Sequence, residues 1–163
     1  MKIVAVVNDT TGTLITSAYK DPKTKIGSIF STGVNAAYME ACGAIPKIKH
    51  CGLPSDLEVA INTEYGAFDV SQKILPRNHF DRVIDQNSSR PGQQLYEKMV
   101  AGLYIGEILR LVLLDLHEQH YIFKGQDCSY LQQKNSINSL FLDRKSTRLN
   151  SSHSGESRMP SSA

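Results

Sequence analysis

A short aliphatic run near the start of the chain constrains the fold more than any other stretch. Ile3 to Val7 is continuously apolar and ends abruptly in Asn8 and Asp9. Such a run is typical of a strand that is buried on both faces of a parallel or mixed sheet. Ligands of these sheets bind just beyond the carboxyl ends of the strands. Residues 2–8 are therefore predicted to form a strand that presents Asp9 at a site.

The residues after Asp9 suit the approach of an anion. Thr10, Thr11 and Thr13 surround Gly12, which allows backbone N–H groups to come close to a negatively charged ligand. An Asn-Asp pair after a strand is also common as a turn or a helix cap. On the pattern alone, this alternative stays open.

The composition is that of a soluble globular protein, and 163 residues can bury one good core. The most apolar stretch, Ile105 to Leu116, is interrupted by Glu107, Arg110 and Asp115, so no membrane span is predicted. No signal peptide is visible after Met1. We therefore expect a cytoplasmic protein without a membrane partner.

The cysteines, the histidines and the net charge argue against several further kinds of site and partner. The three cysteines lack Cys-x-x-Cys spacing, which favours free thiols over a disulfide framework or a zinc site. The five histidines are scattered, and we predict no metal bound by protein side chains. The net charge of +2 is too small to indicate a nucleic-acid partner. Residues 143–163 hold four of the 18 cations and two of the 16 anions, so residues 1–142 carry 14 of each.

Turn signals and apolar spacing predict the elements up to residue 90. In chain order they are a helix, a hairpin, a surface loop, a strand and a helix, over residues 13–19, 25–39, 43–56, 58–63 and 76–85. The hairpin turns at Ser31-Thr32-Gly33, and the strand over 58–63 again ends in a carboxylate, Glu64.

One long helix is predicted over residues 93–119, about 40 Å long at ~1.5 Å per residue. Its apolar stripe consists of Leu95, Met99, Leu103, Leu109, Leu113 and Leu116. Glu107 and Arg110 are spaced to pair on its surface. Glu97 has no cation three or four residues away, so it is either an exposed residue stabilised by the helix dipole or an acceptor for a ligand. One further helical turn is predicted over 127–131.

Motifs in a fixed order resemble the hexokinase family, and are most similar to fungal hexokinases and glucokinases. They are Val7-Asn8-Asp9-Thr10-Thr11-Gly12-Thr13, Thr32-Gly33-Val34-Asn35, Ile61-Asn62-Thr63-Glu64-Tyr65-Gly66, Arg90-Pro91-Gly92-Gln93-Gln94 and Glu97-Lys98-Met99. The resemblance implies an α/β fold of the ribonuclease H-like, actin-type ATPase architecture, with a mixed sheet and a long helix. Residues 1–142 would be part of the large lobe, without the small lobe and the rest of the large lobe.

The resemblance also implies the reaction, which is ATP-dependent phosphorylation of a hexose such as glucose, the first step of glycolysis. Asp9 would be the general base that takes the proton from the sugar 6-hydroxyl as it attacks the γ-phosphate. Sugar hydroxyls would be held by Asn8, Asn35, Glu64 and Glu97. ATP, carrying Mg²⁺ on its phosphates, would contact Thr10, Thr11, Gly12, Thr13, Thr32, Gly33 and Gly102.

One position departs from the family pattern. The hairpin turn of the family is usually Gly-Thr-Gly, whereas Ser31 stands first in this chain. Ser31 would weaken ATP binding if a glycine is needed there for approach to phosphate. The alternative function is therefore a non-catalytic, hexokinase-like sugar-binding or regulatory protein, against which the retention of Asp9 argues. The 163-residue chain by itself is expected to be inactive, because the missing lobe supplies half of the cleft.

The last 21 residues differ in character from the rest. Residues 143–153 and 157–163 resemble two segments of a translated sequencing-library adapter, in order. The tail holds seven serines and shows no hydrophobic period, which independently predicts a disordered segment. We therefore expect residues 143–163 to be non-native and to carry no function.

Overall fold

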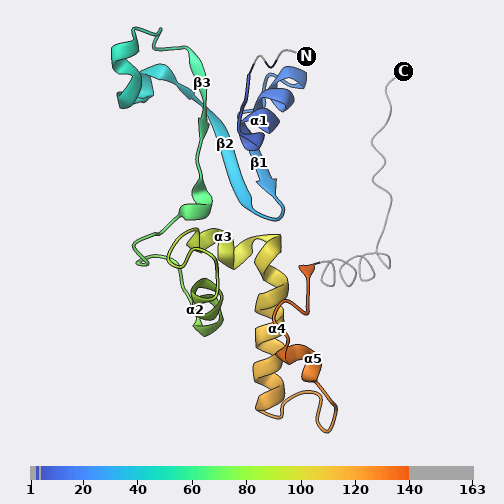
Figure 1. Ribbon diagram of the computed structural model, residues 1–163. Coiled ribbons are helices and arrows are strands. Elements are labelled where there is room, and N and C mark those ends of the chain that lie inside the picture. Colours follow the sequence, from blue (N-terminus) through green and yellow to red (C-terminus); the bar gives the residue numbers. More distant parts are fainter. Residues whose placement is uncertain (1–2, 4, 140–163) are drawn as a thin grey trace, which may run out of the picture. The chain divides into compact units, whose positions relative to one another are not determined.

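The computed structural model describes Ile3 and residues 5–139 (Figure 1). The chain divides into two compact units, Met1–Leu103 and Tyr104–Ala163. Among the described helices, none has the length and apolar character that crossing a bilayer requires. The expected boundary at residue 142 and the tail that follows it lie outside the described residues.

Helix α1 (Asp9–Lys20) opens the first unit. Asn8 caps it, because the side-chain oxygen of Asn8 accepts hydrogen bonds from the amides of Thr10 and Thr11. Asp9 places a negative charge in the first turn, where the helix dipole favours it. These local signals explain why the helix begins earlier than the apolar spacing alone predicts.

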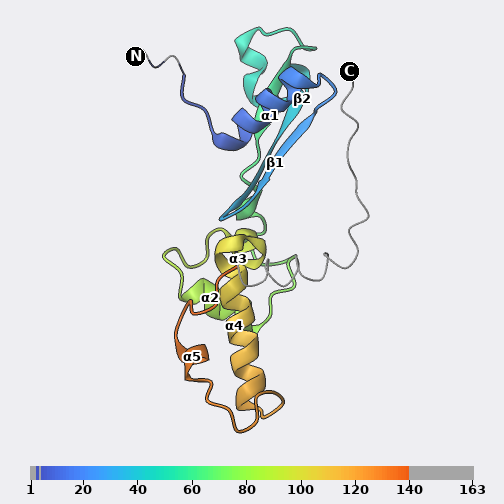
Figure 2. The same cartoon turned by 90° about the vertical axis from the view of Figure 1, so that its right-hand side faces the viewer.

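The sheet consists of three antiparallel strands in the order β1 (Ile26–Phe30), β2 (Val34–Ala41) and β3 (Glu58–Asn62). Strands β1 and β2 form the predicted hairpin, with Phe30 opposite Val34. Helix α1 contacts all three strands and lies against the sheet (Figure 2). Leu14 of α1 and Ala37 of β2 are fully buried in this layer.

The aliphatic run before α1 is not a strand in the described part of the chain, so this prediction is wrong. Ile3, Val6 and Val7 expose 76%, 90% and 60% of their surface. A strand needs a neighbour that pairs with its N–H and C=O groups. The described residues of the run pair with none of the three strands, which pair only with one another.

Gly27 on β1 lies directly against the backbone of α1. A Cβ atom at this position would lie 2.8 Å from both the Cα and the N atom of Leu14. We expect Gly27→Ala in the full-length protein to lower the free energy of unfolding by about 1–3 kcal/mol, because the two backbones must separate. Urea unfolding measures this loss. Gly12→Ala is the control, since its Cβ would meet only Val7, at 3.7 Å, and equal losses in both variants would contradict the argument.

Short elements fill the remainder of the first unit. They are the 3-10 helices η1 (Cys42–Ala44), η2 (Pro46–Cys51) and η3 (Tyr65–Ala67), and the helices α2 (His79–Gln86) and α3 (Leu95–Val100). Helix α2 begins at His79, later than predicted, because Asn78 and Asp81 form a capping box. All three cysteines are free, as predicted.

The single helix predicted over residues 93–119 is wrong, because α3 and α4 (Gly102–Glu118) are separate helices. Ala101 between them has an extended backbone, with φ −78° and ψ 148°. The Gly102 amide donates to the Ser31 carbonyl at 2.8 Å, and the Leu103 amide donates to the Thr32 carbonyl at 3.3 Å. Two amides that an unbroken helix would use internally therefore bind the hairpin turn instead.

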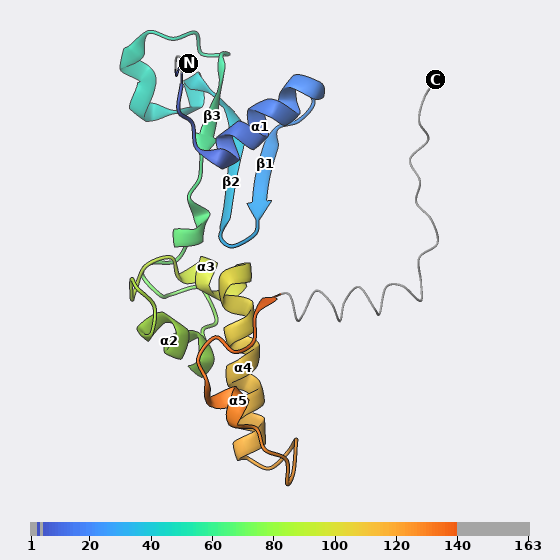
Figure 3. The ribbon, with the colours of Figure 1, turned by 45° about the vertical axis from the view of Figure 1, so that its right-hand side comes forward.

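In the second unit, α5 (Ser129–Gln132) lies beside α4 (Figure 3). It confirms the helical turn predicted over 127–131. The predicted pair of Glu107 and Arg110 is also present, with Arg110 Nη2 2.7 Å from Glu107 Oε1. This pair is buried rather than on the surface, because Arg110 also donates to the carbonyl of Leu131 in α5.

Candidate functional site

Polar side chains gather where β2 begins and β3 ends. This strand-end cluster consists of Asn35, Asn62, Thr63 and Glu64. Asn35 Nδ2 donates to Asn62 Oδ1 at 2.8 Å and to Glu64 Oε1 at 3.1 Å. Asn62 Nδ2 donates to the same Glu64 oxygen at 2.7 Å. The antiparallel register, with Ala37 opposite Asn62, thus brings the two predicted residues Asn35 and Glu64 into direct contact.

The backbone of Glu64 is held in the left-handed conformation, with φ 51° and ψ 37°. A non-glycine residue in this region needs neighbouring contacts to keep it there. The Glu64 amide donates to Asn35 Oδ1 at 3.0 Å, and the Thr63 hydroxyl donates to the Ala36 carbonyl at 2.7 Å. Sequence reasoning missed Asn62 and Thr63. Their signal was a pair of polar residues between an apolar strand and a carboxylate.

The second predicted carboxylate, Glu97, binds the hairpin turn formed by residues 31–34. Glu97 Oε2 accepts a hydrogen bond from the Val34 amide at 2.9 Å. A Cβ atom on Gly33 would lie 2.6 Å from this oxygen, so a side chain at this position would displace the Glu97 carboxylate. Glu97 is thus half-buried and held through one oxygen. It is not the exposed residue, stabilised only by the helix dipole, that the sequence offered as one alternative.

The hairpin turn also presents two unused donors. The amides of Thr32 and Gly33 donate to no described residue, while the Ser31 amide donates to the Gly33 carbonyl at 2.9 Å. The carbonyls of Ser31 and Thr32 are held by the first amides of α4, Gly102 included. Consecutive free N–H groups in a fixed turn form an anion-binding concavity. Because the Gly102 amide binds this turn, the three residues predicted to contact ATP here, Thr32, Gly33 and Gly102, are neighbours.

The start of α1 holds the remaining predicted residues. Asp9 is exposed, and its Oδ1 accepts hydrogen bonds from the Thr10 amide at 2.8 Å and the Thr10 hydroxyl at 3.4 Å. The Thr13 hydroxyl donates to the backbone carbonyl of Asp9 at 2.9 Å. Asn8 serves as the helix cap, as the alternative expected, and Thr11 and Gly12 are half-buried. Among the described residues, no hydrogen bond joins this group to the strand-end cluster or to the hairpin turn.

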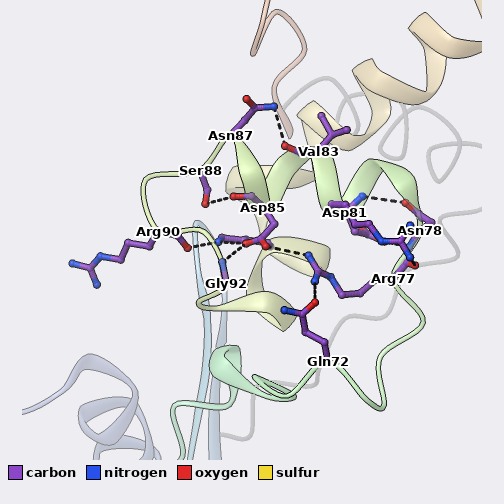
Figure 4. Close-up of polar contacts among 12 residues, drawn as sticks. Gln72, Arg77, Asn78, Asp81, Val83, Asp85, Asn87, Ser88, Arg90 and Gly92 are labelled. Atoms are coloured by element: carbon purple, nitrogen blue, oxygen red, sulfur yellow. Dashed lines mark hydrogen bonds and ion pairs between the residues drawn. The ribbon is translucent and has the colours of Figure 1, made fainter.

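Sequence reasoning also missed a buried charge cluster made of Arg77, Asp85 and Lys98. Lys98 Nζ lies 2.7 Å from Asp85 Oδ1, and Arg77 Nη2 lies 3.3 Å from Asp85 Oδ2. The Gly92 amide donates to Asp85 Oδ1 at 2.9 Å, so Asp85 lies between Arg77 and Gly92 (Figure 4). The three side chains are 5–11% exposed. The available signal was Lys98 itself, which lies three residues after buried Leu95 on the inner face of α3.

The environment keeps Asp85 ionised. Burial raises the pKa of its carboxyl. The hydrogen bonds from Lys98 and the Gly92 amide, together with the Lys98 charge and the hydrogen bond from Arg77, lower this pKa by more than burial raises it. The pKa of Asp85 therefore lies below its ordinary value of 3.8.

Comparisons with known proteins identify relatives that are named hexokinase. The family described as Hexokinase matches residues 25–158. The hexokinase of Emericella nidulans is 56% identical over 143 residues, which are 86% of this chain and 29% of that protein. Hexokinase-2 of Saccharomyces cerevisiae is 52% identical, over 79% of this chain and 27% of that protein. The chain therefore spans less than a third of the length of these relatives.

A solved structure agrees with these relatives. The hexokinase from Schistosoma mansoni complexed with glucose matches with a TM-score of 0.74 and 43% identity, over 86% of this chain and 31% of that one. This likeness supports the fold class that the sequence predicts, of which the described residues form a part.

Proposed function

Because this chain belongs to the hexokinase family, we propose that the full-length protein that contains it transfers the γ-phosphate of ATP to the 6-hydroxyl of a hexose. One observation carries the proposal. The free amides of Thr32 and Gly33 and the strand-end residue Asn35 lie within four consecutive positions of one hairpin. An anion-binding group and a hydroxyl-binding group are thus held side by side on a rigid element, as phosphoryl transfer to a sugar requires.

The hexose would be held by the two anchored carboxylates and by amide side chains. Glu64 and Glu97 accept hydrogen bonds from sugar hydroxyls, and Asn8 and Asn35 both donate and accept. Glucose is the first candidate, because the Schistosoma mansoni relative was solved in complex with it. Binding through Asn8 requires its side chain to exchange at least one helix amide for a hydroxyl.

ATP would lie against the hairpin turn and the start of α1, where the donor groups suit phosphate. When bound, ATP supplies the phosphoryl group, and Mg²⁺ on its phosphates offsets the developing charge. Within the described residues, no group of three His, Cys, Asp or Glu side chains is arranged to hold a metal. The phosphate contacts that we propose come from Thr10, Thr11, Gly12, Thr13, Thr32, Gly33 and Gly102.

Asp9 is the general base that we propose. Its Oδ1 is fixed by Thr10, and its exposure leaves the carboxylate accessible to a hydroxyl.

The test of the proposed function is an assay of the full-length protein for hexose-dependent ADP production, and a lack of ADP production would refute the proposal. The 163-residue chain alone is expected to show none, because it spans less than a third of its relatives. The free cysteines support a cytoplasmic location.

The second candidate is a sugar-binding protein without turnover, and Ser31 is the residue that favours it. Ser31 is exposed and does not have a positive φ, so the backbone of the turn does not require glycine there. We expect Ser31→Gly to change the KM for ATP by less than about threefold, as for other surface substitutions. Steady-state kinetics measure this. A large gain of activity in the variant would favour the non-catalytic candidate.

A further inference from the structure

The buried charge cluster of Arg77, Asp85 and Lys98 has no part in the proposed chemistry. It lies next to Glu97, which is one of the residues proposed to bind the hexose. Lys98, which pairs with Asp85, directly follows Glu97 on α3. Lys98 Nζ also donates to the Arg90 carbonyl at 2.7 Å. Asp85 and the loop after α2 therefore bind α3 at the residue next to Glu97.

Helix α3 has little stability of its own. It is six residues long, and Gln94 before it has a left-handed backbone and makes no side-chain cap. Short isolated helices are marginal in water, so tertiary contacts must decide how α3 is rotated about its axis.

Two contacts act on different faces of α3. Successive residues of a helix project about 100° apart, so Lys98 and Glu97 point in different directions. Lys98 is directed to Asp85 of α2, and Glu97 is directed to the Val34 amide of the hairpin turn. A rotation of α3 that released Lys98 would therefore also displace Glu97.

Helix α3 also packs closely on η3. A Cβ atom on Gly66 would lie 2.9 Å from Gln94 Oε1 and 3.2 Å from Glu97 Cβ. The rings of Tyr65 and Tyr96 are 5.6 Å apart between centroids. These contacts place η3 against α3, beside the contacts of Glu97 and Lys98.

We propose that Asp85 is a positioning residue that, by binding Lys98, fixes the rotation of α3 and holds the Glu97 carboxylate at the hairpin turn, ready for the hexose. The inference rests on the proposed function and deepens it. Asp85 does not touch the substrate, and its effect passes entirely through Lys98 and Glu97.

The test uses the full-length protein and two variants of the pair. Asp85→Asn/Lys98→Met removes both charges, so that no buried charge is left without a partner. Asp85→Glu keeps the charge and lengthens the side chain, which displaces the pair without removing it. We expect each to raise the KM for glucose by about 10- to 100-fold, and the KM for ATP by less, because small displacements of a binding group cost this much.

A surface pair provides the matched control. Lys25 Nζ lies 2.7 Å from Glu58 Oε1, the same distance as in the buried pair, but the two side chains are 55% and 47% exposed. Lys25→Met/Glu58→Gln should leave both KM values unchanged, since exposed pairs contribute little.

A double-mutant cycle with Glu97→Gln separates positioning from general structural damage. If Asp85 acts through Glu97, the Asp85 variants add less than about twofold to the glucose KM of Glu97→Gln. Additive effects, or an unchanged glucose KM in both Asp85 variants, would overturn the inference and leave the proposed function intact. If the double variant does not fold, the cycle with Asp85→Glu decides. A wild-type protein that neither binds nor phosphorylates glucose would overturn both.

Discussion

Replacing Asp9 by asparagine in the full-length protein is expected to lower kcat for hexose phosphorylation by about 10²- to 10⁴-fold, the range that general-base catalysis supplies. The KM for the hexose should change little. Asparagine keeps an oxygen that accepts the Thr10 amide, which binds Oδ1 of Asp9 at 2.8 Å, so the start of α1 should retain its geometry. ADP production measures kcat, and calorimetric titration with glucose measures binding.

Asp56→Asn is the control for this prediction, because Asp56 is also an exposed carboxylate and lies outside the proposed site. Its kcat should equal that of the wild type. An Asp9→Asn variant that retains wild-type kcat would remove Asp9 from the mechanism, whatever its effect on binding.

Lys98→Met is expected to lower the free energy of unfolding of the full-length protein by about 3–5 kcal/mol. The substitution leaves the Asp85 carboxylate buried with only the longer contact of 3.3 Å to Arg77 as an ion pair. Urea unfolding measures the loss. Asp85→Asn/Lys98→Met should recover a large part of it, because the stranded charge is then absent. A double variant less stable than Lys98→Met would contradict this account.

The lowered pKa of Asp85 predicts that the free energy of unfolding depends on pH. The folded state lowers the pKa of Asp85 below 3.8, so its contribution to stability is complete above about pH 4. The contribution is lost as the pH falls through the lower folded pKa. The difference in unfolding free energy between the wild type and Asp85→Asn should therefore be constant from pH 5 to 7 and should shrink in acid. A difference that grows in acid would have the wrong sign.

The local elements were predictable because their signals lie within a few residues. The hairpin of β1 and β2 follows from two short strand-like segments on either side of the turn at Ser31-Thr32-Gly33. The start of α1 follows from Asn8, whose cap was the alternative kept open by the pattern. The aliphatic run before it fails as a strand in the described residues, because pairing depends on a neighbouring strand and not on the run itself.

The candidate site was predicted as residues but not as contacts. Asn35 and Glu64 were each proposed to bind sugar, and the register of β2 and β3 makes them partners. Glu97 was proposed on its lack of a cation, but its partner is a backbone amide, which leaves no trace in side-chain spacing. The roles of these residues in binding stay predictions until the variants are measured.

The sequence by itself determined the family, the hairpin and the free thiols, because each depends on local spacing or on a motif. Only the tertiary structure decided the break at Ala101 and the partners of Glu97 and Lys98. The Glu97 contact joins positions 63 residues apart, and the pair of Asp85 and Lys98 joins positions 13 apart. A helical period is the same for a continuous helix and for two helices with one extended residue between them. The hairpin turn, which accepts the amides of Gly102 and Leu103, distinguishes the two.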